Sequence, residues 1–331
     1  MRLSLSFTGF GPILDDLPAV QTAEECGLDG IWYAEHICAH DAVVPTAIYL
    51  RETQRLEFTL MGINPASRHA GLTAMELASL AEIAPNRVRA AIGTGVPDMV
   101  ARIGKSIDKP IASTISLYRS LKAALAGNEL TMDKPDFSFA DYRLTPLGPP
   151  PDLDIMAVRP RMVETAARYA DGVCLSAGSS RPYLAETVRQ VESTLAATGR
   201  RREDFRISVM IPAVITEELD KARKSVASVL SAFDATTAEY LAAGAIPPGA
   251  LVQAAERGSA EAAKVFTPEV VDALAIVCPP DGIAESLASY AETGVDEIAI
   301  TPLMPPAQVP DLIRLLAEHR PELTAQCSTT P

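Results

Sequence analysis

The chain has 331 residues, with 29 Lys or Arg against 42 Asp or Glu, so its formal net charge at pH 7 is −13. A charge of this sign disfavours binding to the phosphate backbone of nucleic acids. The proportions of hydrophobic residues (48%) and charged residues (21%) are those of an ordinary globular chain and exclude intrinsic disorder.

The first residues reach Gly11 and Pro12 before any long apolar run builds up. This start lacks the apolar region of a signal peptide and the length of a membrane span, so we expect a soluble cytoplasmic enzyme with no membrane partner. The five cysteines form no C-x-x-C pair, which argues against a zinc knuckle, a redox dithiol or a disulfide framework.

Eight short apolar runs alternate along the chain with stretches of helical periodicity. The runs cover residues 3–7, 30–34, 56–61, 88–92, 153–157, 172–176, 207–215 and 297–301. Eight strands, each followed by a helix, are the count of a (β/α)8 TIM barrel, an α/β fold. The runs are apolar nearly throughout, as expected for strands covered on both faces. A doubly wound open sheet is the alternative.

We predict a single domain over residues 1–331 with two insertions, one after strand 4 at about 127–151 and one after strand 7 at about 216–281. Such insertions build a lid or a substrate pocket, or they contact another subunit. Their aromatic residues could contact an apolar substrate or belong to the core. A C-terminal tail is expected at about 321–331.

Reactive groups of a (β/α)8 barrel lie where strands end, so the polar residues after each run are the candidates. Glu35 and His36 follow the second run. His36 could act as a proton donor, with Glu35 fixing its tautomer or the local loop. His36 could instead be a structural residue of the rim. A metal site with His40 and Asp41 is a third interpretation, but no second cluster completes it, so we expect no metal.

The third and fourth runs end in small residues. Gly62 is followed by Asn64-Pro65, which indicates either a bulge where the backbone approaches a ligand or a plain turn. Gly93-Thr94-Gly95 would let backbone N–H groups approach an anion or a flat ring. The full G-x-G-x-x-G pattern is absent because Asp98 stands at its last position, which argues against a Rossmann dinucleotide site.

Arginines flank the start of the helix that follows the fifth run. Arg159 and Arg161 stand on either side of Pro160, which suits a first helical turn. A helix N-terminus with two arginines would bind a phosphate, although both side chains could simply face solvent. Ser176, after the sixth run, belongs to a second candidate phosphate loop.

Together these segments resemble the luciferase-like oxidoreductase superfamily, especially its coenzyme F420-dependent branch that includes methylenetetrahydromethanopterin reductase. The resemblance is carried by AEECGLDGIWYAEH at 23–36, GINPASRH at 62–69, PNRVRAAIGTG at 85–95 and ARYADGVCLS at 167–176. It covers most of residues 1–215 and is loose over 216–280.

The resemblance implies that F420, or alternatively FMN, binds at the mouth of the barrel and exchanges a hydride with a small-molecule substrate. Glu35 and His36 then stand where the family has an acid and a histidine beside the ring, and the Met61–Gly62 peptide stands where it has a non-proline cis bond. The cofactor-binding residues implied are Met61, Gly62, Asn64, Gly93, Thr94, Gly95, Ala157, Val158, Arg159, Arg161 and Ser176.

The chain also departs from the family pattern. Arg159 replaces a glycine, so either it supplies charge to the phosphate tail or the tail site is altered. Val96 and His40 are the expected substrate contacts, and they replace a glutamate and a tryptophan of the sugar-phosphate dehydrogenases, which makes glucose 6-phosphate an improbable substrate. An FMN-dependent monooxygenase and a cofactor-free partner subunit are the alternatives.

The resemblance further implies a homodimer that forms through helices near strands two and three. Leu72, Met75 and Leu80 lie in this part of the chain. Core packing would explain the same residues equally well.

Overall fold

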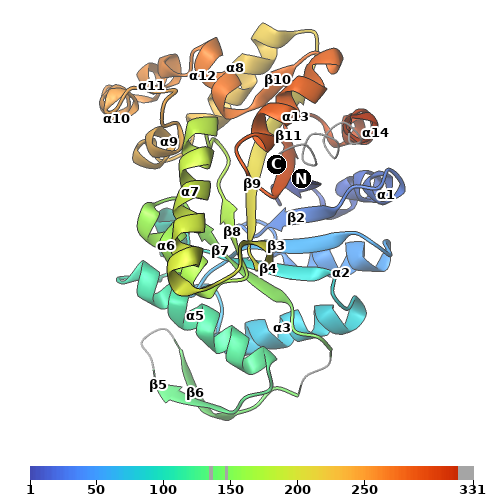
Figure 1. Cartoon of the computed structure of the whole chain (residues 1–331), viewed down its shortest axis with the longest axis vertical. Helices are drawn as coiled ribbons and strands as arrows, with labels where there is room; N and C mark the ends of the chain where they lie inside the picture. Colours follow the sequence, from blue (N-terminus) through green and yellow to red (C-terminus); the bar gives the residue numbers. More distant parts are fainter. Residues whose placement is uncertain (134–136, 146–147, 320–331) are drawn as a thin grey trace.

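The computed structural model describes residues 1–133, 137–145 and 148–319, so the expected tail at 321–331 lies outside the described residues. Eight parallel strands form a barrel surrounded by helices (Figure 1). The strands are β1 (Arg2–Phe7), β2 (Gly30–Ala34), β3 (Glu57–Ile63), β4 (Val88–Ile92), β7 (Asp152–Ala157), β8 (Gly172–Leu175), β9 (Arg206–Ile215) and β11 (Glu297–Pro302). All eight predicted strands are therefore confirmed.

Pairing between β8 and β9 closes the ring, in register from Gly172 opposite Arg206 to Leu175 opposite Val209. Every neighbouring pair is parallel, and β1 pairs with both β2 and β11. The predicted closed barrel is confirmed, and the open-sheet alternative is wrong. A further strand, β10 (Ile276–Cys278), pairs with the end of the ten-residue β9 outside the ring.

The helices cover the outside of the barrel and return the chain from the end of one strand to the start of the next (Figure 1). They are α1 (Leu17–Glu25), α2 (Val43–Arg51), α3 (Ala70–Ile83), α4 (Pro97–Arg102), α5 (Pro110–Leu125), α6 (Pro160–Tyr169), α7 (Arg181–Thr198), α13 (Ile283–Ala291) and α14 (Val309–Glu318). Helix α7 shows how local sequence sets such bounds, because the Ser180 hydroxyl accepts from the Tyr183 N–H and Gly199 ends the helix at φ 68°.

The first insertion follows α5 and not strand β4 directly. It contains an antiparallel hairpin of β5 (Leu130–Asp133) and β6 (Ser138–Tyr142). The Tyr142 hydroxyl donates to Gly71 O at 2.8 Å, and Phe137 and Phe139 are buried against the His69 ring. These two phenylalanines therefore pack in the core beside α3, as the second of the two interpretations predicts.

The second insertion forms a helical layer with its own buried apolar cluster, which includes Val226, Leu251 and Val271. Its helices are α8 (Leu219–Leu230), α9 (Ala235–Leu241), α10 (Ala250–Glu256), α11 (Ser259–Val265) and α12 (Pro268–Leu274). They gather beside the N-terminal half of α7 (Figure 1). Among the described residues no helix is both long and apolar enough to cross a membrane.

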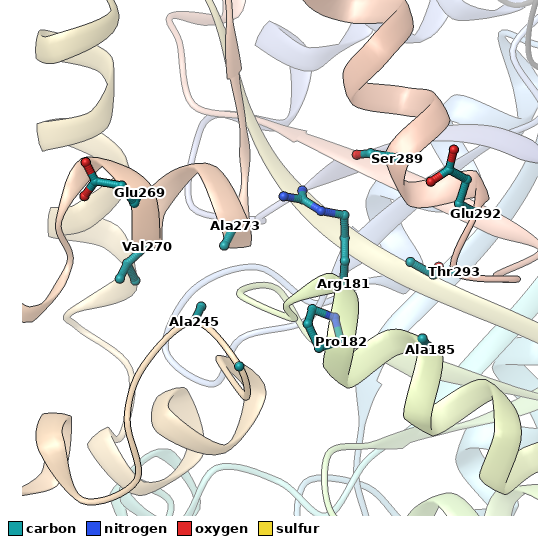
Figure 2. A pocket seen from close by; sticks show the side chains of 11 residues that line it. Arg181, Pro182, Ala185, Ala245, Glu269, Val270, Ala273, Ser289, Glu292 and Thr293 are labelled. Atoms are coloured by element: carbon teal, nitrogen blue, oxygen red, sulfur yellow. The ribbon is translucent and has the colours of Figure 1, made fainter.

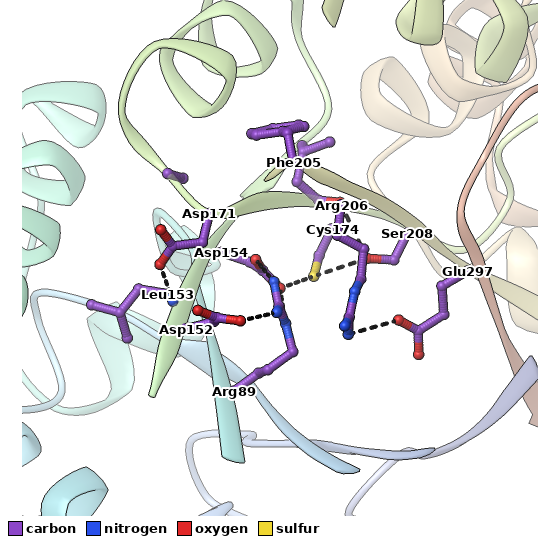
Figure 3. A network of polar contacts seen from close by, with 12 residues as sticks. Arg89, Asp152, Leu153, Asp154, Asp171, Cys174, Phe205, Arg206, Ser208 and Glu297 are labelled. Atoms are coloured by element: carbon purple, nitrogen blue, oxygen red, sulfur yellow. Dashed lines mark hydrogen bonds and ion pairs between the residues drawn. The ribbon is translucent and has the colours of Figure 1, made fainter. Parts of the chain in front are cut away.

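A network of charged and polar side chains fills the amino-terminal end of the barrel (Figure 3). Arg89 is 4% exposed and donates two hydrogen bonds to Asp154, at 3.1 and 2.5 Å. Glu297 accepts from Ser4, Trp32 and Arg206. Most of these side chains belong to the first residues of their strands. The network therefore fills the amino-terminal end of the barrel, opposite the end where the strands finish and the candidate residues lie.

Candidate functional site

Five neighbouring strands bring the predicted site residues to one rim. The barrel order β2-β3-β4-β7-β8 places their carboxyl ends next to one another. The predicted site residues at or just after these strand ends are 35–36, 62–64, 93–96, 157–161 and 176. The expectation that these distant segments share one end of the fold is a direct consequence of the parallel barrel.

Glu35 points to the loop after β3 and binds Arg68. The Glu35 Oε2 to Arg68 Nη2 distance is 2.5 Å, and Arg68 Nη1 lies 2.5 Å from Glu76 Oε2. Glu35 Oε2 also accepts from the Ala42 N–H at 3.4 Å. Burial raises the pKa of Glu35, and the Arg68 guanidinium opposes that shift. Of the two roles considered for Glu35, these contacts support fixing the loop.

His36 faces the other side of β2, toward the loop after β1. Its ring stacks on Phe10, with centroids 4.3 Å apart and planes inclined by 36°. His36 Nδ1 is buried and has no hydrogen-bond partner in the described part of the chain. Burial lowers the pKa of His36, while the nearby main chain of Ala34 and Thr8 opposes the shift. A lowered pKa favours the neutral imidazole, the form that can accept a proton.

His40 links two loops of the rim. Its Nδ1 lies 3.1 Å from Gly9 O, and since a carbonyl only accepts, Nδ1 carries the proton in this contact. The His40 main-chain oxygen accepts from the His36 N–H at 3.2 Å. The side chain expected to contact substrate therefore also supports the loop that carries His36.

The peptide between Met61 and Gly62 is trans, so the expected cis bond is wrong. A bulge stands there instead, with a register shift between Met61 and Ile63 and φ 90° at Gly62. A Cβ at Gly62 would lie 2.7 Å from Glu35 O, so the close approach that requires glycine is to the neighbouring strand end.

The Asn64 side chain shapes its own loop. Its Oδ1 accepts from the N–H groups of Ala66 and Ser67 at 3.1 Å, and its Nδ2 donates to Gly62 O at 3.1 Å. Asn64 is only 4% exposed. The polar atoms of Asn64 are thus used in an Asx turn, and its contact with a cofactor stays a prediction.

After β4, the chain continues through three small residues, Gly93, Thr94 and Gly95. Gly95 has φ 77°, and a Cβ there would lie 2.9 Å from Val100 Cγ2. Thr94 is half-buried, while Val96 is exposed and precedes α4. Gly93 is buried and its N–H donates to Ile63 O at 2.8 Å, so only the half-buried Thr94 and Gly95 lie partly exposed beside the Val96 side chain.

The two arginines at the start of α6 differ in their surroundings. Arg159 Nη2 donates to Thr236 O at 3.0 Å, and its guanidinium lies 4.2 Å from the Tyr240 ring centroid. Arg161 is exposed, and the described residues provide no ion-pair partner for it. Two explanations were considered for Arg159, a charge for the phosphate tail or an altered tail site. These contacts support the second, because the Arg159 side chain binds two residues of the second insertion.

The remaining predicted phosphate contacts lie at the ends of β7 and β8. Ala157 is buried, and Val158 O accepts from the Tyr183 hydroxyl at 2.8 Å. Ser176 is half-buried, and its carbonyl accepts from the Ser179 hydroxyl at 2.7 Å. These contacts order the two loops on either side of the α6 N-terminus.

A cavity of about 660 Å³ lies away from the predicted site residues, between α7, α12 and α13 (Figure 2). Arg181 projects between Glu269 and Glu292 there, and no predicted site residue lines the cavity. Within the described ranges, no three His, Cys, Asp or Glu side chains are grouped to hold a metal ion.

Arg68 and Phe10 are the rim residues that the sequence analysis did not select. Arg68 lies within the quoted GINPASRH segment, and a lone basic residue after the strand next to Glu35 was the available signal. Phe10 follows the first strand, but an isolated aromatic residue gives no periodic signal.

The fold and the rim together define a (β/α)8-barrel enzyme whose acid–base candidate is a half-buried histidine at the carboxyl-terminal mouth. The chain belongs to the luciferase-like monooxygenase family, which matches residues 15–297, and it is an oxidoreductase of that family.

Named relatives span nearly the whole chain. A 5,10-methylenetetrahydromethanopterin reductase of Methanolobus tindarius is 25% identical over 308 residues, which cover 90% of this chain and 93% of that protein. The structure of a coenzyme F420 dependent tetrahydromethanopterin reductase from Methanopyrus kandleri superposes with a TM-score of 0.82 and 16% identity, covering 97% of this chain and 99% of that one. The monooxygenase RslO1 from Streptomyces bottropensis has a TM-score of 0.76 and 20% identity, with coverages of 97% and 99%.

Proposed function

We propose that the protein is an F420-dependent oxidoreductase that transfers a hydride between the deazaflavin and a small organic substrate. The observation that carries this proposal is the His36 imidazole at the mouth, whose buried Nδ1 has no partner among the described residues. The names of the similar reductases support F420 as the cofactor. When bound, F420 would supply a two-electron hydride donor or acceptor.

Two groups of residues at the rim would hold a flat ring with an anionic tail. Thr94 and Gly95 would lie against the ring, because glycine lets backbone N–H groups approach a ligand closely, whereas the N–H of the buried Gly93 is bonded to Ile63 O. The α6 N-terminus has no side-chain cap, and Arg161 beside it is exposed. These groups would hold the phosphate.

His36 would hold or move the proton that accompanies hydride transfer, through its imidazole ring. Glu35 and Arg68 would act indirectly. Their ion pair joins the loop that carries His36 to the loop after β3, and Glu35 also accepts from the Ala42 N–H. His36→Ala should reduce turnover by roughly 100- to 10,000-fold while leaving cofactor affinity nearly unchanged. An unchanged turnover number would remove His36 from the reaction.

Titration of the purified protein with F420 and with FMN tests the cofactor, by fluorescence quenching and calorimetry. Micromolar binding of F420 alone supports the proposal. Tight binding of FMN alone would favour a flavin monooxygenase, as the similarity to RslO1 allows, and binding of neither would favour a cofactor-free subunit.

A matched pair of variants on α6 tests the phosphate site. Arg161→Ala should weaken F420 binding by about tenfold, the loss of one partly solvated charge-assisted hydrogen bond. Arg168→Ala is the control, because Arg168 is paired with Glu164 on the same helix. Equal effects of the two variants would place the phosphate elsewhere.

We also propose that the chain forms a homodimer through α3. Leu72, Met75 and Ile83 are exposed on this helix, whereas Leu80 is buried in the core. Leu72→Arg should shift the sedimentation coefficient from dimer to monomer, and a monomeric parent protein would contradict the proposal.

A further inference from the structure

Phe10 combines high exposure with a specific contact. Its side chain is 63% exposed, yet its ring stacks on His36 with centroids 4.3 Å apart. Phe10 follows β1, so it approaches His36 from the strand on the side opposite Glu35 and Arg68.

The loop that carries Phe10 is held in place by two contacts. Gly9 has φ 71°, and a Cβ there would lie 2.3 Å from Ala34 O, so only glycine allows this approach to the end of β2. Gly9 O accepts from His40 Nδ1 at 3.1 Å. Phe10 is therefore fixed to the strand end that supplies His36.

The stacked ring covers one face of the imidazole. The His36 backbone is held by a hydrogen bond from its N–H to His40 O and by another from the Ala39 N–H to its carbonyl. With the backbone held and one face covered, the ring has little freedom to turn. The exposed part of Phe10 remains available to a ligand.

We propose that Phe10 is a positioning and specificity-determining residue, which orients the His36 imidazole and offers an apolar face to substrates that have a flat, conjugated group at the reacting carbon. The substrate class in this inference rests on the proposed function. The positioning role does not, because it rests on the contact between the Phe10 and His36 rings.

Nuclear magnetic resonance of the imidazole signals tests the positioning role without any cofactor. The chain has four histidines, which His→Gln variants assign one at a time. Phe10→Leu should move the His36 signals downfield, because the ring current of Phe10 is lost. The His69 signals, next to Phe137 and Phe139, should stay in place. Unmoved His36 signals in a folded Phe10→Leu variant would overturn the positioning role.

Two small probes test specificity through the same His36 signals. Cyclohex-2-enone is flat and conjugated, and cyclohexanone is its saturated counterpart of nearly equal size. The parent protein should bind cyclohexenone about 2- to 12-fold more tightly, as expected for one aromatic contact, and Phe10→Leu should remove the preference. Equal binding of both probes, or binding of neither, would overturn the specificity role. Failure of F420 binding with intact stacking signals would instead refute the proposed function alone.

Discussion

Replacing Arg68 should destabilise the protein far more than neutralising its partner Glu35. Arg68 lies 2.5 Å from both Glu35 and Glu76, whose side chains are 7% and 33% exposed. In Arg68→Met, Glu35 keeps only the Ala42 N–H at 3.4 Å, so a buried carboxylate loses its counterion. Breaking a buried pair costs about 3–5 kcal/mol, and the partial exposure of this one places the expected loss near 3 kcal/mol.

Glu35→Gln leaves Arg68 bound to Glu76 and removes a charge that burial disfavours. We expect a loss of about 1 kcal/mol, the value of one hydrogen bond. In Arg68→Met the pKa of Glu35 should rise further, so the deficit should shrink as the pH falls and Glu35 becomes protonated.

Urea unfolding at pH 7 and pH 5 measures both losses, provided that the m-values agree. Glu164→Ala is the control, because its exposed pair with Arg168 should contribute less than about 0.5 kcal/mol. If Glu35→Gln costs as much as Arg68→Met, or if the Arg68→Met deficit grows at pH 5, the view that Arg68 serves to compensate a buried Glu35 is refuted.

Two further substitutions examine the rim and its support. Gly62→Ala should lower the free energy of unfolding by about 2–4 kcal/mol, because φ is 90° there and the new Cβ would lie 2.7 Å from Glu35 O. Gly11→Ala, whose Cβ would have no atom within 4 Å, is the control and should leave stability unchanged. Equal melting temperatures of the two variants would contradict the close approach at Gly62. Burial raises the pKa of Asp16 from 3.8 to about 6, so its stabilising contribution is present below pH 3.8 and is lost as the pH rises through 6. Asp16→Asn should therefore be more stable than the parent at pH 7.5 by about 1 kcal/mol after allowance for solvent screening, with no gain near pH 4. A gain that is constant from pH 4 to 8 in thermal unfolding would exclude the titration of Asp16 as its cause.

The placement of the candidate residues at neighbouring strand ends was predictable, whereas several of their contacts were not. Glu35 and His36 were selected because they follow a strand, and in the structure their side chains leave β2 on opposite sides, as adjacent strand residues do. The partner of Arg159 was not predictable, because Thr236 and Tyr240 belong to an insertion about 77 residues further along the chain. The cis bond expected at Met61 was wrong, and a glycine bulge provides the local geometry.

The sequence by itself determined the eight strands, their order and the rim where chemistry is possible. Burial of both faces of a strand requires continuous apolar runs, and such runs are local features that can be read along the chain. Only the tertiary structure decided which polar groups meet. Arg68 binds Glu35 across 33 positions, and Phe10 contacts His36 from the loop after β1. Such pairs depend on barrel closure and loop geometry, for which side-chain type and spacing along the chain give no signal.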